Sequence, residues 1–237
     1  MKKLALLAIA LFMTYVSFAQ SSLTYGFKIG MNYSTFTGKD AKPSMAEQEE
    51  MEAMGMSDFK VTYKPDLHVG AFLNVALTDQ FSLRPEVMYS IKGAKFSFNG
   101  PDFENIDWEE YMNDPENYQL GTRKYEGSET LYYLDVPVLL QYRINRIALQ
   151  AGPTASLFLK YKSEFEGEEP EEEENAGDND YRKLDLGYAA GVSYELENGI
   201  GFSLRYNGGL SNLDKHNNYK AKNSTFQFSL SYTIGNK

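Results

Sequence analysis

The sequence contains no cysteine, two histidines and one tryptophan in 237 residues. Without cysteine there is no lipoprotein acylation site and no disulfide framework, so hydrogen bonds and packing must hold the mature domain together. The two histidines, His68 and His216, provide little for general acid and base catalysis. No apolar run in the sequence reaches the roughly 20 residues that a transmembrane helix needs. These absences exclude a lipoprotein and a multi-helix membrane protein, and they count against an enzyme.

The N-terminus has the pattern of a secretory signal peptide. Two lysines precede an apolar run over residues 4–13, and small side chains follow at Ser17 and Ala19. An uncleaved anchor helix is the alternative, but the run is too short to span a bilayer. We therefore predict a signal peptide at residues 1–19, cleaved after Ala19, and one exported domain at residues 20–237.

The charge of the chain is strongly negative. Removing the signal peptide takes away two lysines and no acidic residue, which changes the formal charge from −10 to −12. This charge argues against nucleic acid as a partner and against a polybasic membrane patch. The sequence also has 18 tyrosines, an amphipathic residue that is enriched where side chains meet a membrane interface.

Strict alternation of apolar and polar residues is the main structural signal, because it places successive side chains on opposite faces of a strand. In the first segment, Phe27 and Ile29 share one face, and Lys28 and Gly30 share the other. Eight segments alternate in this way: 25–34, 67–77, 81–92, 132–144, 147–161, 184–196, 200–207 and 226–234. An even number of such segments indicates a barrel.

The connections between these segments alternate in length. Three are tight turns, at residues 78–80, 145–146 and 197–199. Long polar stretches separate the other segments, at roughly 38–62, 99–129, 162–180 and 211–222. Short turns at one rim and long loops at the other are the plan of outer-membrane barrels, whose long loops face outside the cell.

A soluble eight-stranded barrel with an apolar ligand cavity would show the same alternation. Its charged face would then cover the exterior, whereas in a membrane barrel that face fills a narrow lumen. Tyrosines lie toward both rims of the apolar faces, as in two interfacial girdles: Tyr25, Tyr142, Tyr194 and Tyr232 near the turns, and Tyr132, Tyr161 and Tyr206 near the loops. We predict an all-β fold, an eight-stranded antiparallel up-and-down transmembrane β-barrel with short periplasmic turns and long extracellular loops, in a bacterial outer membrane.

Charges inside a narrow barrel must be paired, because an unpaired buried charge is costly. We predict a structural charge network that closes the lumen, with a proton or ion pathway as the alternative. The network comprises Arg84, Glu86, Asp135, Arg143, Asp185, Glu195 and Arg205.

Five short stretches carry a family resemblance: residues 26–32 (GFKIGMN), 83–90 (LRPEVMYS), 133–140 (YLDVPVLL), 151–153 (AGP) and 205–212 (RYNGGLSN). In this order they resemble the PorT-family outer-membrane β-barrel domain of Bacteroidetes. The resemblance implies an eight-stranded membrane barrel in a bacterium with two membranes. The resemblance does not imply one function: the family takes its name from a member linked to type IX secretion, most relatives have no assigned role, and the long acidic loops of this chain depart from a typical member.

The loop at residues 163–180 holds ten acidic residues and no lysine or arginine. Such a run repels itself and is expected to stay solvated. The functional alternative is a low-affinity calcium site at Asp178 and Asp180, since hard oxygen ligands suit Ca²⁺, although the spacing of an EF-hand loop is lacking. The sequence predicts no cofactor.

Two other loops have distinctive compositions. Four methionines among glutamates, Met45 to Met56, indicate a short helix near the rim, either packed on its own loop or offering a partner groove. In the next loop, Trp108, Tyr111 and Tyr118 either order the loop or recognise a glycan or protein.

The sequence predicts the class of function but no specific ligand. His216 with Asp214 and Ser211 is the sole local arrangement of catalytic residue types, and neighbours in sequence rarely form a working triad. We predict a barrel, not an enzyme, that acts as a surface-exposed structural or binding scaffold, its acidic loops meeting a protein, glycan or cation. The alternative is a subunit of an envelope secretion or transport apparatus, which would contact other secretion proteins.

Overall fold

The structure is a computed structural model, and it describes residues 23–116, 118–166, 171–173, 181–216 and 218–235. The predicted signal peptide with its cleavage site after Ala19, and the proposed calcium ligands Asp178 and Asp180, lie outside these residues. The strands are β1 (Leu23–Gly38), β2 (Ser57–Ala76), β3 (Phe81–Pro101), β4 (Thr122–Ile144), β5 (Ile147–Phe165), β6 (Glu171–Glu173), β7 (Leu184–Glu195), β8 (Ile200–Gly209) and β9 (Ala221–Ile234). Two helices, α2 (Met45–Ala53) and α3 (Trp108–Asn113), lie in the first two long connections.

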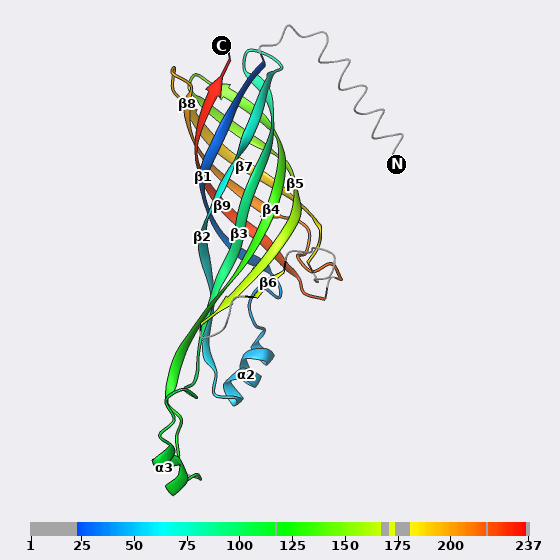
Figure 1. Ribbon diagram of the computed structural model, residues 1–237. Helices are drawn as coiled ribbons and strands as arrows, with labels where there is room; N and C mark the ends of the chain where they lie inside the picture. Colours follow the sequence, from blue (N-terminus) through cyan, green and yellow to red (C-terminus); the bar gives the residue numbers. More distant parts are fainter. Residues whose placement is uncertain (1–22, 117, 167–170, 174–180, 217, 236–237) are drawn as a thin grey trace.

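Eight of these strands form a closed antiparallel ring (Figure 1). Each strand pairs with its neighbour along the chain, except that β5 pairs with β7 past the short β6. The ring closes between the first and last strands, where Tyr25 pairs with Ile234 and Gly38 with Ala221. The predicted all-β, eight-stranded antiparallel barrel is therefore confirmed.

The two faces of the barrel wall are reversed relative to a soluble protein. On β1, the side chain of Phe27 is 60% exposed, whereas Lys28 is 3% exposed and points into the lumen. The same alternation leaves leucine, valine, isoleucine and phenylalanine side chains exposed around the whole ring. Within the described residues, neither helix has the length and apolar character needed to cross a membrane. The outward apolar belt is what a strand-built membrane domain requires.

The two ends of the barrel differ. Both ends of the described chain and the three tight connections lie at one end, here called the turn end (Figure 1). One of these turns is the two-residue hairpin between Ile144 and Ile147, where Asn145 adopts a left-handed φ of 54° that asparagine tolerates. The long connections lie at the opposite end.

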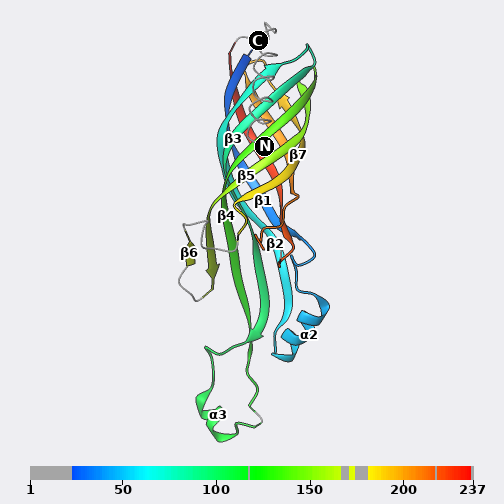
Figure 2. The same ribbon diagram turned by 90° about the vertical axis from the view of Figure 1, so that its right-hand side faces the viewer.

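The boundaries predicted for the long loops are wrong at three places. Strand β2 begins at Ser57, inside the predicted loop 38–62, and the β3–β4 hairpin extends through residues 81–101 and 122–144. Strand β5 likewise continues to Phe165. The extensions of β2, β3, β4 and β5 form a sheet that projects beyond the ring and is here called the blade, and β6 pairs with the extended part of β5. Helix α3 lies at the far tip of the blade (Figures 1 and 2). Alternation continues there with aromatic and charged residues, which pair as strands without forming an apolar belt.

Both helices have identifiable N-terminal caps. Ser44 and Glu47 form a reciprocal capping box at α2, which fits the predicted helix among the methionines. The Asp107 carboxylate accepts hydrogen bonds from two backbone amides at the start of α3.

Candidate functional site

The centre of the lumen holds one carboxylate surrounded by three cations. Arg205 donates two hydrogen bonds to Glu86, at 2.8 and 2.9 Å. Arg84 donates from Nε at 3.0 Å, and Nζ of Lys28 lies 3.2 Å from the same carboxylate. The Glu86 side chain is fully buried. A carboxylate with this many charge-assisted hydrogen bonds is held in a fixed position.

Each arginine of this cluster has a second partner. The guanidinium of Arg84 lies 3.5 Å from the centre of the Phe72 ring. Arg205 also donates to Oε1 of Gln150 at 2.7 Å. Stacking and neutral acceptors therefore help to offset the excess of positive charge around Glu86.

The predicted network separates into three groups along the barrel. Arg84, Glu86 and Arg205 lie together at the centre. Asp135 pairs with Lys92 at 2.9 Å, and Asp185 accepts from Asn223 at 2.9 Å. Near the turn end, Arg143 and Glu195 lie 3.5 Å apart, and the Arg143 side chain is 36% exposed.

Lys28 and Lys92 were missing from the predicted network, although both occupy polar positions of alternating segments. Each supplies a direct partner to a predicted acid, Lys28 to Glu86 and Lys92 to Asp135. Alternation places both lysines on the lumen face. It does not show which acid on another strand each lysine pairs with.

An apolar cluster lies toward the blade end of the lumen. Its buried members are Ala41, Leu131, Tyr133, Phe158, Leu213 and Ala221. Tyr133 and Phe158 meet edge to face with their ring centroids 5.7 Å apart. These inward side chains occupy the polar face of alternating strands, so the sequence pattern gave no reason to expect them. Two loop residues, Ala41 and Leu213, complete the cluster from outside the strands.

The two histidines have structural surroundings. His68 is buried in the lumen, with its ring nitrogens 2.9 Å from Oδ1 of Asn32 and 2.9 Å from Oγ of Ser229. The Asp214 carboxylate accepts hydrogen bonds from the backbone amides of His216, Asn218 and Tyr219, and these bonds lower its pKa.

The hydroxyl of Ser211 accepts a hydrogen bond from the backbone amide of Leu186 at 3.0 Å. Ser211 and Asp214 thus both accept hydrogen bonds from backbone amides. Across the described part of the chain, no group of three or more acidic or histidine residues is placed to hold a metal ion.

One face of the blade carries a row of aromatic rings, here called the aromatic ladder, that crosses four strands. Its members are Phe59 of β2, Phe96 and Phe98 of β3, Tyr125 of β4 and Phe165 of β5. Phe98 stacks on Phe59 at 5.1 Å and on Tyr125 at 5.3 Å between ring centroids. The Arg123 guanidinium lies over the Tyr125 ring, 5.6 Å from the ring centre. All five rings remain partly exposed.

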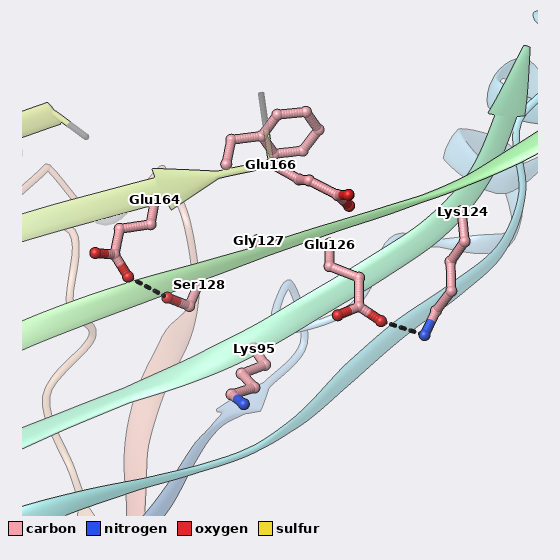
Figure 3. A pocket seen from close by; sticks show the side chains of 8 residues that line it. Lys95, Lys124, Glu126, Gly127, Ser128, Glu164 and Glu166 are labelled. Carbon is pink, nitrogen blue, oxygen red and sulfur yellow. Dashed lines mark hydrogen bonds and ion pairs between the residues drawn. The ribbon is translucent and has the colours of Figure 1, made fainter. Parts of the chain in front are cut away.

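Next to the ladder lies an open, charged cavity of about 630 Å³ (Figure 3). Lys124 pairs with Glu126, and Glu164 lies 3.5 Å from the hydroxyl of Ser128. Lys95 of β3 also faces this space. The charges come from three adjacent strands, so the blade presents an amphipathic surface beyond the barrel.

Comparison with known families identifies the chain's relatives. A sequence model of the family described as outer membrane protein beta-barrel domain matches residues 18–215. The chain belongs to this family. Membership and the outward apolar belt place the barrel in a bacterial outer membrane.

The solved structures that match the chain include the three that follow. The attachment invasion locus protein Ail of Yersinia pestis, solved with the heparin analogue sucrose octasulfate, is 13% identical, and the alignment covers 90% of this chain and 99% of that one with a TM-score of 0.42. Neisserial surface protein A is 9% identical, with 88% and 96% covered and a TM-score of 0.47. OprG of Pseudomonas aeruginosa is 11% identical, with 91% and 96% covered and a TM-score of 0.33. A comparison with curated proteins finds no match.

Proposed function

We propose that the protein is a surface-exposed structural and binding scaffold of the outer membrane, with a lumen closed by side chains and a blade that meets partners outside the cell. The aromatic ladder carries this proposal. Partly exposed aromatic rings beyond the apolar belt have no lipid to contact, and such rings are enriched at the centres of binding surfaces. The acidic connections beside the blade favour a protein, glycan or cation as partner.

The orientation follows from the lengths of the connections. Outer-membrane barrels keep short turns in the periplasm and long connections outside. The turn end, with both ends of the described chain, therefore faces the periplasm in this proposal. The blade and α3 then extend into the extracellular space.

The side chains inside the ring support the proposal that the lumen is closed. The charged groups around Glu86 and the apolar cluster around Phe158 occupy successive levels of an eight-stranded ring, which is only wide enough for side chains. A scaffold of this kind passes no solute, so binding must reside in the extramembrane part.

Binding by the blade is tested with two matched double variants. Phe98→Ser with Tyr125→Ser removes the centre of the ladder, and Lys95→Ser with Lys124→Ser changes the charged face of the same strands. The purified barrel in detergent is applied to glycan and protein arrays. We expect the ladder variant to weaken wild-type binding at least about tenfold, as loss of a central aromatic contact does, and the lysine variant to retain it. Absence of any bound component, or equal loss in both variants, would contradict the proposal.

The PorT-like secretion role is the second candidate, supported by the five sequence stretches that resemble that family, including 83–90 and 205–212. It predicts co-purification with other envelope proteins and a secretion defect on deletion of the gene. Secretion of the normal set of proteins by the deletion strain would contradict this role and leave the scaffold unaffected.

A further inference from the structure

A second cavity lies at the blade end of the lumen beside the apolar cluster, with which it shares Phe36, Tyr181 and Leu213. Its volume is about 400 Å³, and it is partly enclosed. Phe36 of β1, Glu129 of β4, Tyr181 and the β8–β9 connection form its walls. Three of the lining side chains are aromatic, namely Phe36, Tyr181 and Tyr219.

Glu129 is the unusual member of this cavity. Its carboxylate forms no ion pair among the described residues, and its one hydrogen bond there comes from the Tyr181 hydroxyl at 3.4 Å. Burial raises the pKa of Glu129, which lies on the blade side of Val136, the nearest strongly exposed large apolar residue of β4. A partly buried carboxylate without a cation partner among the described residues is costly to ionise, so its environment favours a ligand that supplies the missing charge.

The described side chains around the cavity are held by other contacts, and none of them forms an ion pair with Glu129. Tyr181 packs between Phe158 and Tyr161, with ring centroids 5.2 and 5.0 Å away. The guanidinium of Arg182 donates hydrogen bonds to two backbone carbonyl oxygens. Its Nε lies 2.9 Å from that of Asn212, and its Nη2 lies 3.3 Å from that of Asp214.

The Asp214 carboxylate, also in the cavity wall, is held by three backbone amides. Among the described acids that line the cavity, Glu129 is therefore the one available to a ligand. Burial and, to a lesser extent, the Glu129 carboxylate raise the pKa of Tyr219, which also lines the cavity.

We propose that this cavity binds an organic cation, an alkylammonium or guanidinium group that pairs with Glu129 and packs against Phe36, Tyr181 and Tyr219. Aromatic faces attract cations, and a carboxylate beside them fixes the position of the charge. The cation comes either from a free amine or from a lysine or arginine side chain of a partner protein. The cavity is separate from the aromatic ladder. If the cavity binds no cation, the proposed binding role of the blade is unaffected.

The test uses the full-length mature barrel in nonionic detergent and three small probes: n-butylammonium, n-butylguanidinium and neutral n-butanol. Binding is followed by calorimetry for the wild type, for Glu129→Gln and for Glu126→Gln. The last variant removes an exposed carboxylate on the same strand and serves as the matched control. Heat-modifiable migration on a gel verifies that each variant is folded.

We expect at least one cation to bind the wild type more tightly than n-butanol does. Glu129→Gln should weaken that binding at least about tenfold, because the neutral amide cannot form an ion pair with the cation, whereas Glu126→Gln should leave it within about twofold. No binding of either cation at millimolar concentration, equal affinity for n-butanol, or equal affinity in Glu129→Gln would overturn the proposal.

A blocked tripeptide with a central lysine distinguishes the two sources of the cation. Binding of this peptide at least as tight as that of n-butylammonium indicates a side chain of a partner protein. Binding of the free amine alone indicates a small-molecule ligand. Both results support the cation site, and the corresponding norleucine peptide provides the neutral reference.

Discussion

Arg205 of β8 reaches across the lumen and forms a two-pronged ion pair with Glu86 of β3, through distances of 2.8 and 2.9 Å. The two residues are 119 positions apart in the sequence, and the pair joins opposite parts of the ring. Because Lys28 and Arg84 contact the same carboxylate, Glu86 is the acceptor on which three buried cations depend.

Replacing Glu86 with glutamine should therefore destabilise the barrel strongly. Removing one partner of a buried ion pair costs about 3–5 kcal/mol, and here three cations lose their common partner. The free energy of unfolding is measured by urea titration of the barrel in detergent. The exposed Glu126→Gln variant should change it by less than about 0.5 kcal/mol. Equal stability of Glu86→Gln and the wild type would show that the cluster does not hold the strands together.

Replacing Arg84 with alanine should weaken the barrel without opening it. The variant loses the hydrogen bond to Glu86 and the contact with Phe72, but the remaining lumen side chains still fill the ring. The expected outcome is a lower melting temperature in detergent and no new conductance in planar bilayers. A large conductance would mean that this one side chain closes a pathway, and the closed-scaffold account would be wrong.

The Asp214 loop should lose its order in acid. Backbone amides of His216, Asn218 and Tyr219 hold the pKa of Asp214 below its ordinary value of 3.8. A lowered folded-state pKa means that this contribution to stability is complete above 3.8 and is lost as the pH falls through the folded-state value. Hydrogen-exchange protection of the three amides should thus drop below that pH in the wild type. In Asp214→Ala, protection should be low at every pH; unchanged protection there would contradict the assignment.

The barrel itself was predictable from residues because its wall has one apolar face and one polar face. Phe27 and Lys28 at adjacent positions already indicate which face meets lipid and which meets the lumen. The tight turn at Asn145 was equally visible, since few residues adopt its left-handed backbone conformation. These features depend on local sequence, so period and turn chemistry are sufficient to find them.

The rest depends on contacts between distant strands. Nothing local distinguishes the blade residues Phe59 and Phe98 from loop residues, because their strands are stabilised by pairing rather than by an apolar belt. Phe158 breaks the polar pattern of the lumen face because a loop residue, Leu213, packs against the same apolar cluster. The separation of the predicted network into three groups follows from strand register, which alternation alone does not specify.

The absence of cysteine makes the proposed orientation directly measurable. Single cysteines replace Met112 in α3, which is 73% exposed, and Asp79 in the β2–β3 turn, which is also exposed. Intact cells are treated with a membrane-impermeant maleimide before and after permeabilisation of the outer membrane. The account predicts that Met112→Cys is labelled on intact cells and that Asp79→Cys is labelled only after permeabilisation. The reverse pattern, or labelling of neither site until the cells are opened, would contradict a surface-exposed scaffold.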